Sequence, residues 1–182
     1  GIEQLRRLSG LELTSGAQYA AYETDIAFVC ALQHPEFTAL QSATGGPSNW
    51  TVAGDANFAH VYQMTSITAN GGTNLKVVGT VATSMGLTAA AIATTQLIMQ
   101  FRPRIVVMVG IAAGTRGGNK EFGDILVADP SVDYNSGKVV QENGVRGFLP
   151  DSYPIGLNAR LRSVIQRYRA PNPLFQRLRS TW

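Results

Sequence analysis

Residues 105–114 read IVVMVGIAAG, a run of five apolar residues that passes directly into a turn of glycine and alanine. A strand that is covered on both faces of a sheet needs a continuous apolar run of this kind. Small residues beyond the end of a strand let the backbone approach a ligand closely. The stretch therefore predicts a central strand of an α/β sheet, followed by a loop suited to line a binding site.

The segments before this strand predict a helix, a hairpin and a further strand. Residues 88–101 are dominated by helix-forming residues and contain neither Gly nor Pro, so we expect a helix that Pro103 ends. Residues 60–68 and 75–82 flank an Asn-Gly-Gly-Thr turn, which favours an antiparallel hairpin. The apolar residues 25–31 predict a buried strand.

Other segments predict the following structure. Pro35 suits the first turn of a helix. Residues 41–58 are rich in Gly, Ser, Thr, Asn and Pro and indicate a loop. We expect a strand at residues 124–128 and an extension of the sheet through residues 131–140, around a turn at residues 135–137. Apolar residues at helical spacing predict an amphipathic helix at residues 157–169.

Composition indicates one soluble globular domain. The 182 residues include 45% hydrophobic and 15% charged residues, which fits neither a disordered chain nor a membrane protein. The first 24 residues form a leader or linker, and residues 25–182 form the domain. No signal peptide and no long apolar segment is evident, so we expect a cytoplasmic protein.

The charged and sulfur-containing residues do not suggest nucleic-acid or metal chemistry. The net charge of +3 comes partly from arginines in the last quarter of the chain, which are best placed on the solvated face of a helix. No nucleic-acid or membrane partner is therefore expected. Cys30 lies in an apolar run and is expected to be a buried thiol. The sequence holds no metal-ligand cluster, and we expect no cofactor.

Four segments, in this order, resemble the purine and uridine phosphorylase superfamily: DIAFVCALQHPE at residues 25–36, SMGLTAAA at 84–91, VGIAAG at 109–114 and FGDILVAD at 122–129. Within that superfamily the chain is most similar to methylthioadenosine/S-adenosylhomocysteine nucleosidases. It also resembles the phosphorylase-like effector domains of bacterial antiphage defence proteins, some of which are ATP nucleosidases. The resemblance implies a three-layer α/β sandwich with a central mixed sheet, a purine nucleoside or nucleotide substrate and a homo-oligomer.

The resemblance also implies a catalytic residue. In the nucleosidases a glutamate after the first strand orients and deprotonates the attacking water, and Glu36 is the candidate here. The alternative is that Glu36 only stabilises the N-terminus of a helix through the helix dipole. His34 lies close to it in sequence and is expected to be structural or exposed.

Three loops are expected to bind the substrate, and each has a plain structural alternative. The first loop places the ribose or an anion, although its methionine could equally be a core residue. The second lines the ribose and base, or simply packs a helix on a sheet. The third segment follows the second and carries a basic residue that is expected to contact the phosphate chain of a nucleotide substrate. The alternative is that this residue belongs to a solvated loop. The residues are, in order, Ser84, Met85, Gly86, then Ile111, Ala112, Ala113, Gly114, and finally Arg116, with Lys120 nearby.

Hydrolysis is favoured over phosphorolysis. Hexameric phosphorylases carry an arginine and a serine or threonine around the second glycine turn, whereas this chain has Met108 and Ile111 there. The groups that would hold a phosphate dianion are therefore missing. True phosphorolysis and a nucleoside-binding module without turnover remain as alternatives.

The later part of the superfamily pattern is absent. It supplies a Met-Glu pair for the ribose hydroxyls and a Ser-Asp pair whose aspartate protonates the purine, and neither pair occurs in this sequence. We therefore expect a domain that is incomplete at its C-terminus. If the chain supplies an acid of its own, the candidates are Asp124, Asp129, Asp133 and Asp151.

Overall fold

A computed structural model describes residues 22–54, 59–69, 71–113, 124–151 and 153–167. The chain divides into two compact units, Gly1–Ile111 and Ala112–Trp182. Each unit is described by itself. Among the described residues no helix is both long and apolar enough to cross a membrane.

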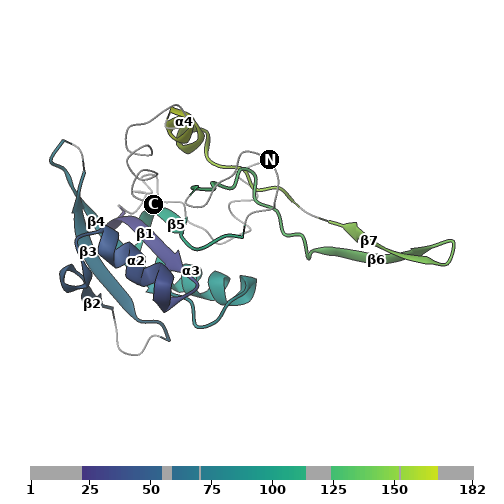
Figure 1. Cartoon of the computed structure of the whole chain (residues 1–182), viewed down its shortest axis with the longest axis horizontal. Helices are drawn as coiled ribbons and strands as arrows, with labels where there is room; N and C mark the ends of the chain where they lie inside the picture. The colour runs from purple at the N-terminus through teal and green to yellow at the C-terminus, as the bar shows by residue number, and fades with distance from the viewer. Residues whose placement is uncertain (1–21, 55–58, 70, 114–123, 152, 168–182) are drawn as a thin grey trace, which may run out of the picture. The chain divides into compact units, whose positions relative to one another are not determined.

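The first unit is built on a five-stranded mixed sheet in the order β2-β3-β4-β1-β5 (Figure 1). Strand β1 pairs in parallel with β4 on one side and with β5 on the other. Strands β2, β3 and β4 pair antiparallel. The strands are β1 (Thr24–Cys30), β2 (Thr51–Ala53), β3 (Tyr62–Thr68), β4 (Asn74–Val81) and β5 (Pro103–Met108).

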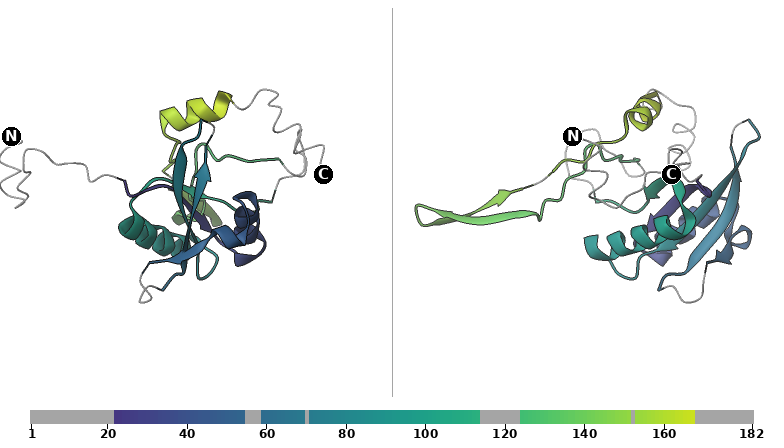
Figure 2. Two further views of the ribbon diagram at one scale, coloured as in Figure 1. Left: turned by 90° about the vertical axis from the view of Figure 1, so that its left-hand side faces the viewer. Right: turned by 180° about the vertical axis from the view of Figure 1, so that it is seen from behind.

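Helices cover both faces of this sheet, which confirms the three-layer α/β architecture (Figure 2). Helix α3 (Leu87–Phe101) lies on one face. The short helices η1 (Gln33–Phe37), α2 (Thr38–Ala43) and η2 (Pro47–Asn49) lie on the other side. The periodic apolar residues of α3 face the sheet, as burial of apolar surface requires.

Each face of the sheet has its own apolar core. On the α3 face the helix buries one residue per turn against the sheet: Ala89, Ala93, Leu97 and Phe101 pack on Ala27, Val29, Val78 and Tyr62. On the other face Phe37 and Trp50 meet edge to face, with ring centroids 5.5 Å apart, over Cys30 and Val77. This packing fixes the position of η1, which carries Glu36, relative to the strand ends.

The hairpin, the first strand and the Ala-rich helix are confirmed as β3–β4, β1 and α3. The loop prediction for residues 41–58 is partly wrong, because β2 pairs with β3 there. The strand predicted at residues 105–109 exists as β5 but is not central. It is one of the two edge strands of the described sheet, and its residues Val106 and Met108 are exposed.

The described part of the second unit holds a hairpin and a helix. Strands β6 (Gly137–Glu142) and β7 (Val145–Pro150) pair antiparallel, and Ser131 forms a bridge with Ile155 (Figure 1). Asn143 and Gly144 join the strands with φ angles of 51° and 79°. Positive φ at both central residues is what a type I′ hairpin turn needs.

Two strand predictions for this unit are therefore wrong. Residues 124–128 form no strand and pair with none of the described strands. Residues 131–140 do not extend the five-stranded sheet, because the pairing runs from Gly137 across the Asn143–Gly144 turn into β7. A turn does form at Tyr134 and Asn135, where the Asn135 N–H donates to Asp133 Oδ1 at 3.0 Å, but the strands pair across Asn143 and Gly144 instead.

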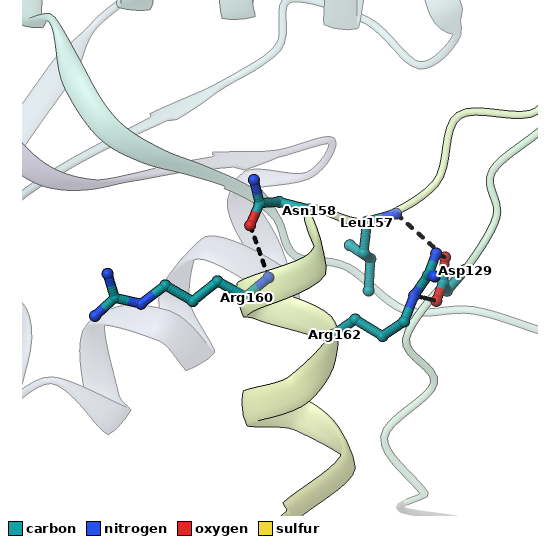
Figure 3. Close-up of polar contacts among 5 residues, drawn as sticks. All are labelled: Asp129, Leu157, Asn158, Arg160 and Arg162. Carbon is teal, nitrogen blue, oxygen red and sulfur yellow. Dashed lines mark hydrogen bonds and ion pairs between the residues drawn. The ribbon is translucent and has the colours of Figure 1, made fainter.

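The amphipathic helix is confirmed as α4 (Ala159–Arg167). Its start is fixed by Asn158, whose side-chain oxygen accepts a hydrogen bond from the backbone N–H of Arg160 at 2.9 Å (Figure 3). Asp129 accepts two hydrogen bonds from the Arg162 guanidinium, at 2.7 and 2.9 Å, and one from the Leu157 N–H at 3.1 Å. This bidentate pair connects the residues before the hairpin to the helix.

Candidate active site at the carboxyl edge of the sheet

Three parallel strands end together at one edge of the sheet. Cys30 is opposite Val81, and Val29 is opposite Met108, so β1, β4 and β5 end at nearly the same level. Ligands of open α/β sheets bind at the carboxyl ends of the strands. The loops that leave these ends contain the residues that the sequence singled out.

Glu36 is the buried polar residue at this edge, with 8% of its surface exposed. Its Oε2 accepts hydrogen bonds from the backbone N–H groups of Ala31 and Leu32, both at 3.0 Å. Its Oε1 accepts a hydrogen bond from the N–H of Ile111 at 2.9 Å. The carboxylate therefore connects the loop after β1 to the loop after β5.

These contacts define the ionisation of Glu36. Burial alone would raise its pKa, but the hydrogen bonds from Ile111, Leu32 and Ala31 outweigh this effect and lower the pKa below the ordinary value of 4.5. The side chain is therefore an anion at neutral pH. A carboxylate offers about four acceptor positions; three are filled by the protein, which leaves one on Oε1.

Gly110 is required beside this carboxylate. A Cβ atom at Gly110 would lie 2.8 Å from Glu36 Oε1, closer than Cβ contacts occur in proteins. Gly110 belongs to the glycine-alanine turn that the sequence predicted to line the site. Its position directly beside the Glu36 carboxylate was not predicted.

Cys30 lies close to Glu36 but is not a nucleophile. Burial, together with repulsion from the Glu36 charge, raises the pKa of the thiol to about 11. A thiol with that pKa is protonated at neutral pH and unreactive. The expectation of a buried structural thiol is confirmed.

The loop after β4 brings Ser84, Met85 and Gly86 to the same edge. All three are exposed, so Met85 is not a core methionine. Gly86 caps α3 with a φ angle of 115°, a conformation that glycine adopts without strain. These residues are free to meet a ligand, and their role in binding stays a prediction.

The loop after β5 is only partly described. Ile111 is exposed and donates to Glu36 through its backbone. Ala112 and Ala113 are exposed and begin the second unit, so the structure does not place them against the first. Gly114, Arg116 and Lys120 lie outside the described residues.

Asp129, one of the candidate acids, is unsuited to donate a proton. Its hydrogen bonds from Arg162, with that from the Leu157 N–H, hold the pKa of its carboxyl below the ordinary value (Figure 3). Within the described ranges no three His, Cys, Asp or Glu side chains gather in a way that could hold a metal ion.

Comparison with known proteins bears on the family to which this chain belongs. A family model described as "Phosphorylase superfamily" matches residues 25–177, which include residues of both units. An uncharacterized protein, y4jS, of Sinorhizobium fredii (strain NBRC 101917 / NGR234) is 34% identical over an alignment of 183 positions that covers 97% of this chain. The chain covers only 43% of that relative's length. No solved structure matches significantly. The match over most of its length shows that this chain belongs to the phosphorylase superfamily.

Proposed function

We propose that the protein cleaves the N-glycosidic bond of a purine nucleoside or nucleotide, with water as the nucleophile. The observation that carries this proposal is the buried Glu36 carboxylate at the ligand-binding edge of the sheet, ionised and with one acceptor position unfilled. Membership of the phosphorylase superfamily supports nucleoside chemistry in general. The choice of water and of the purine is our proposal.

In this mechanism Glu36 holds a water molecule through Oε1. As the C–N bond to the base breaks, its electron pair moves into the base and positive charge builds on the ribose. The water oxygen then bonds to the anomeric carbon, and its proton passes to Glu36. The departing base takes a proton from an acid that we do not assign.

The lowered pKa of Glu36 favours a role in orienting the water over a role in removing its proton early. A weakly basic carboxylate contributes little by removing a proton early in the reaction. It contributes more by orienting the water and by placing negative charge near the cationic sugar. We therefore assign Glu36 mainly a positioning and electrostatic function, with proton transfer late along the reaction path.

The residues around Glu36 also favour water over phosphate. Met108 and Ile111 stand where hexameric phosphorylases carry an arginine and a hydroxyl residue, and both side chains are exposed and apolar. A phosphate dianion needs charge-assisted hydrogen bonds. Ser84, Met85, Gly86, Ala112, Ala113, Gly114 and Arg116 remain the proposed contacts for the rest of the substrate.

The test measures free base by chromatography after the purified full-length protein is incubated with adenosine, methylthioadenosine, inosine, AMP or ATP. We expect base release in phosphate-free buffer and no increase when phosphate is added. Release that depends strictly on phosphate would establish phosphorolysis. Binding without any release would support the sensing module, and a preference for ATP would support a role like that of the antiphage effectors.

A further inference from the structure

A cavity opens beside the Glu36 site. It has a volume of about 350 Å³, at the lower end of the range for small-molecule pockets. Gln33 and Phe37 of η1 flank Glu36 and form one wall, and Thr83 comes from the loop that carries Ser84–Gly86. We name this space the His60 cavity, lined by Gln33, Phe37, Ala59, His60, Val61, Gln63, Val81 and Thr83.

His60 is the unusual residue in this lining. Only 5% of its surface is exposed, and its Nδ1 lies 2.8 Å from Oε1 of Gln96 on α3. Because a carbonyl oxygen accepts, Nδ1 carries the proton, and a neutral imidazole then presents Nε2 as an acceptor. That nitrogen is buried and has no hydrogen-bond partner among the described residues.

A buried acceptor without a partner is costly unless something else supplies a donor. None of the described side chains that line the His60 cavity carries a carboxylate, ammonium or guanidinium group. The lining instead offers the amides of Gln33 and Gln63 and the hydroxyl of Thr83 beside the apolar Phe37 and Val81. This chemistry fits an uncharged group that bears hydroxyls, because a buried phosphate would find no counter-charge there.

We propose that the His60 cavity receives an uncharged, hydroxyl-bearing part of the nucleoside substrate, with a hydroxyl donating to His60 Nε2. The inference rests on the proposed function and adds a specificity residue to it. Because Nε2 is itself buried, the contact requires a side chain of the cavity wall to move aside as the ligand enters.

The main test closes the cavity from its exposed rim. Val61 lines the cavity and is 66% exposed, so Val61→Trp fills the opening without disturbing the core. Val52, 77% exposed on β2 and outside the lining, gives the matched control Val52→Trp. By titration calorimetry of the full protein with adenosine, we expect Val61→Trp to raise the Kd at least about tenfold and Val52→Trp to leave it within about twofold.

A second measurement follows the ring nitrogen directly. Imidazole ¹⁵N spectra of the wild-type protein should show His60 protonated at Nδ1, and adenosine should shift the Nε2 resonance. His60→Phe, which keeps a ring of similar size, should bind adenosine as weakly as Val61→Trp. An unshifted Nε2 resonance, or equal affinities in the two tryptophan variants, would overturn the proposal.

The outcomes also separate this inference from the proposed function. If wild type and Val61→Trp release adenine from adenosine equally well, the nucleosidase assignment stands and the His60 cavity has no part in it. If the wild-type protein neither binds nor cleaves any of the five substrates, both ideas fail. Reduced binding and reduced cleavage in Val61→Trp alone would support both.

Discussion

At the residue scale the site depends on how one carboxylate is satisfied. Glu36 accepts from three backbone N–H groups on two loops, and Gly110 leaves the space that its Oε1 needs. The resemblance to the nucleosidases pointed to Glu36, which follows the first strand. The sequence could not predict the bond from Ile111 or the need for Gly110, because these residues lie more than 70 positions from Glu36 in the chain.

Replacing Glu36 tests its role in the chemistry. We expect Glu36→Gln to lower the rate of base release by at least about 10²-fold, since an amide places no negative charge near the cationic sugar and cannot take the late proton from water. Its NH₂ group would also face a backbone N–H in place of an acceptor, so some loss of stability is expected. Base release is measured by chromatography of the reaction mixture.

Glu142→Gln is the matched control, because Glu142 is an exposed glutamate on β6. It should retain the wild-type rate. If Glu36→Gln also keeps nearly full turnover, Glu36 serves only to join the two loops, and the proposed mechanism is wrong.

The lowered pKa of Glu36 predicts a dependence of stability on pH. Its folded pKa lies below the ordinary value of 4.5, so the unfolded state binds more protons between the two values. The stabilisation by its charge is complete above pH 4.5 and is lost as the pH falls through the folded pKa. Urea unfolding gives the free energy of unfolding of wild type and of Glu36→Gln from pH 7 downward. The difference between the two free energies should stay constant down to about pH 4.5 and become smaller in more acidic solution.

In the same series the free energy of unfolding of Glu142→Gln should differ from that of wild type by an amount that does not change with pH, because Glu142 is exposed on β6. A difference between wild type and Glu36→Gln that is independent of pH would mean that the Glu36 charge contributes nothing to stability.

At the scale of the elements, local patterns predicted what local forces decide. The composition of α3 and the turn between β3 and β4 act over a few residues, and both elements formed as expected. The position of β5 in the sheet depends on which strands pair with it, and its apolar run cannot tell an edge from the centre. The β6–β7 pairing was not predicted, although Asn143-Gly144 between the two strands is a typical hairpin turn.

Two leucines of α3 give a test of the packing that holds the helix on the sheet. Leu97 is fully buried in the α3-face core, whereas Leu87 at the start of the helix is mostly exposed. Leu97→Ala should lower the free energy of unfolding by about 2–5 kcal/mol, because it leaves a cavity. Leu87→Ala should change it by no more than about 0.5 kcal/mol. Equal effects in chemical denaturation would show that α3 does not pack on the sheet as described.

At the scale of the whole molecule, the two units differ in how they bury apolar groups. The first unit has two cores, one on each face of its sheet. None of the described residues after 123 is buried. Apolar side chains on the β6–β7 hairpin are exposed instead: Val139, Val140, Val145, Phe148 and Leu149. Exposed apolar surface of this extent commonly marks an interface.

We propose that this hairpin takes part in a homo-oligomer, and a single added charge tests it. Val139 lies opposite Phe148 across the hairpin, and Gln141, two residues along β6, shares its face. Val139→Lys removes an apolar contact and adds a charge, whereas Gln141→Lys adds the same charge without removing an apolar side chain.

In sedimentation velocity we expect the wild-type chain to self-associate as its concentration rises. Val139→Lys should shift toward the monomer, and Gln141→Lys should change less. A wild-type chain that stays monomeric would overturn the proposal. Equal shifts in both variants would mean that charge repulsion, and not the apolar contact, governs the association.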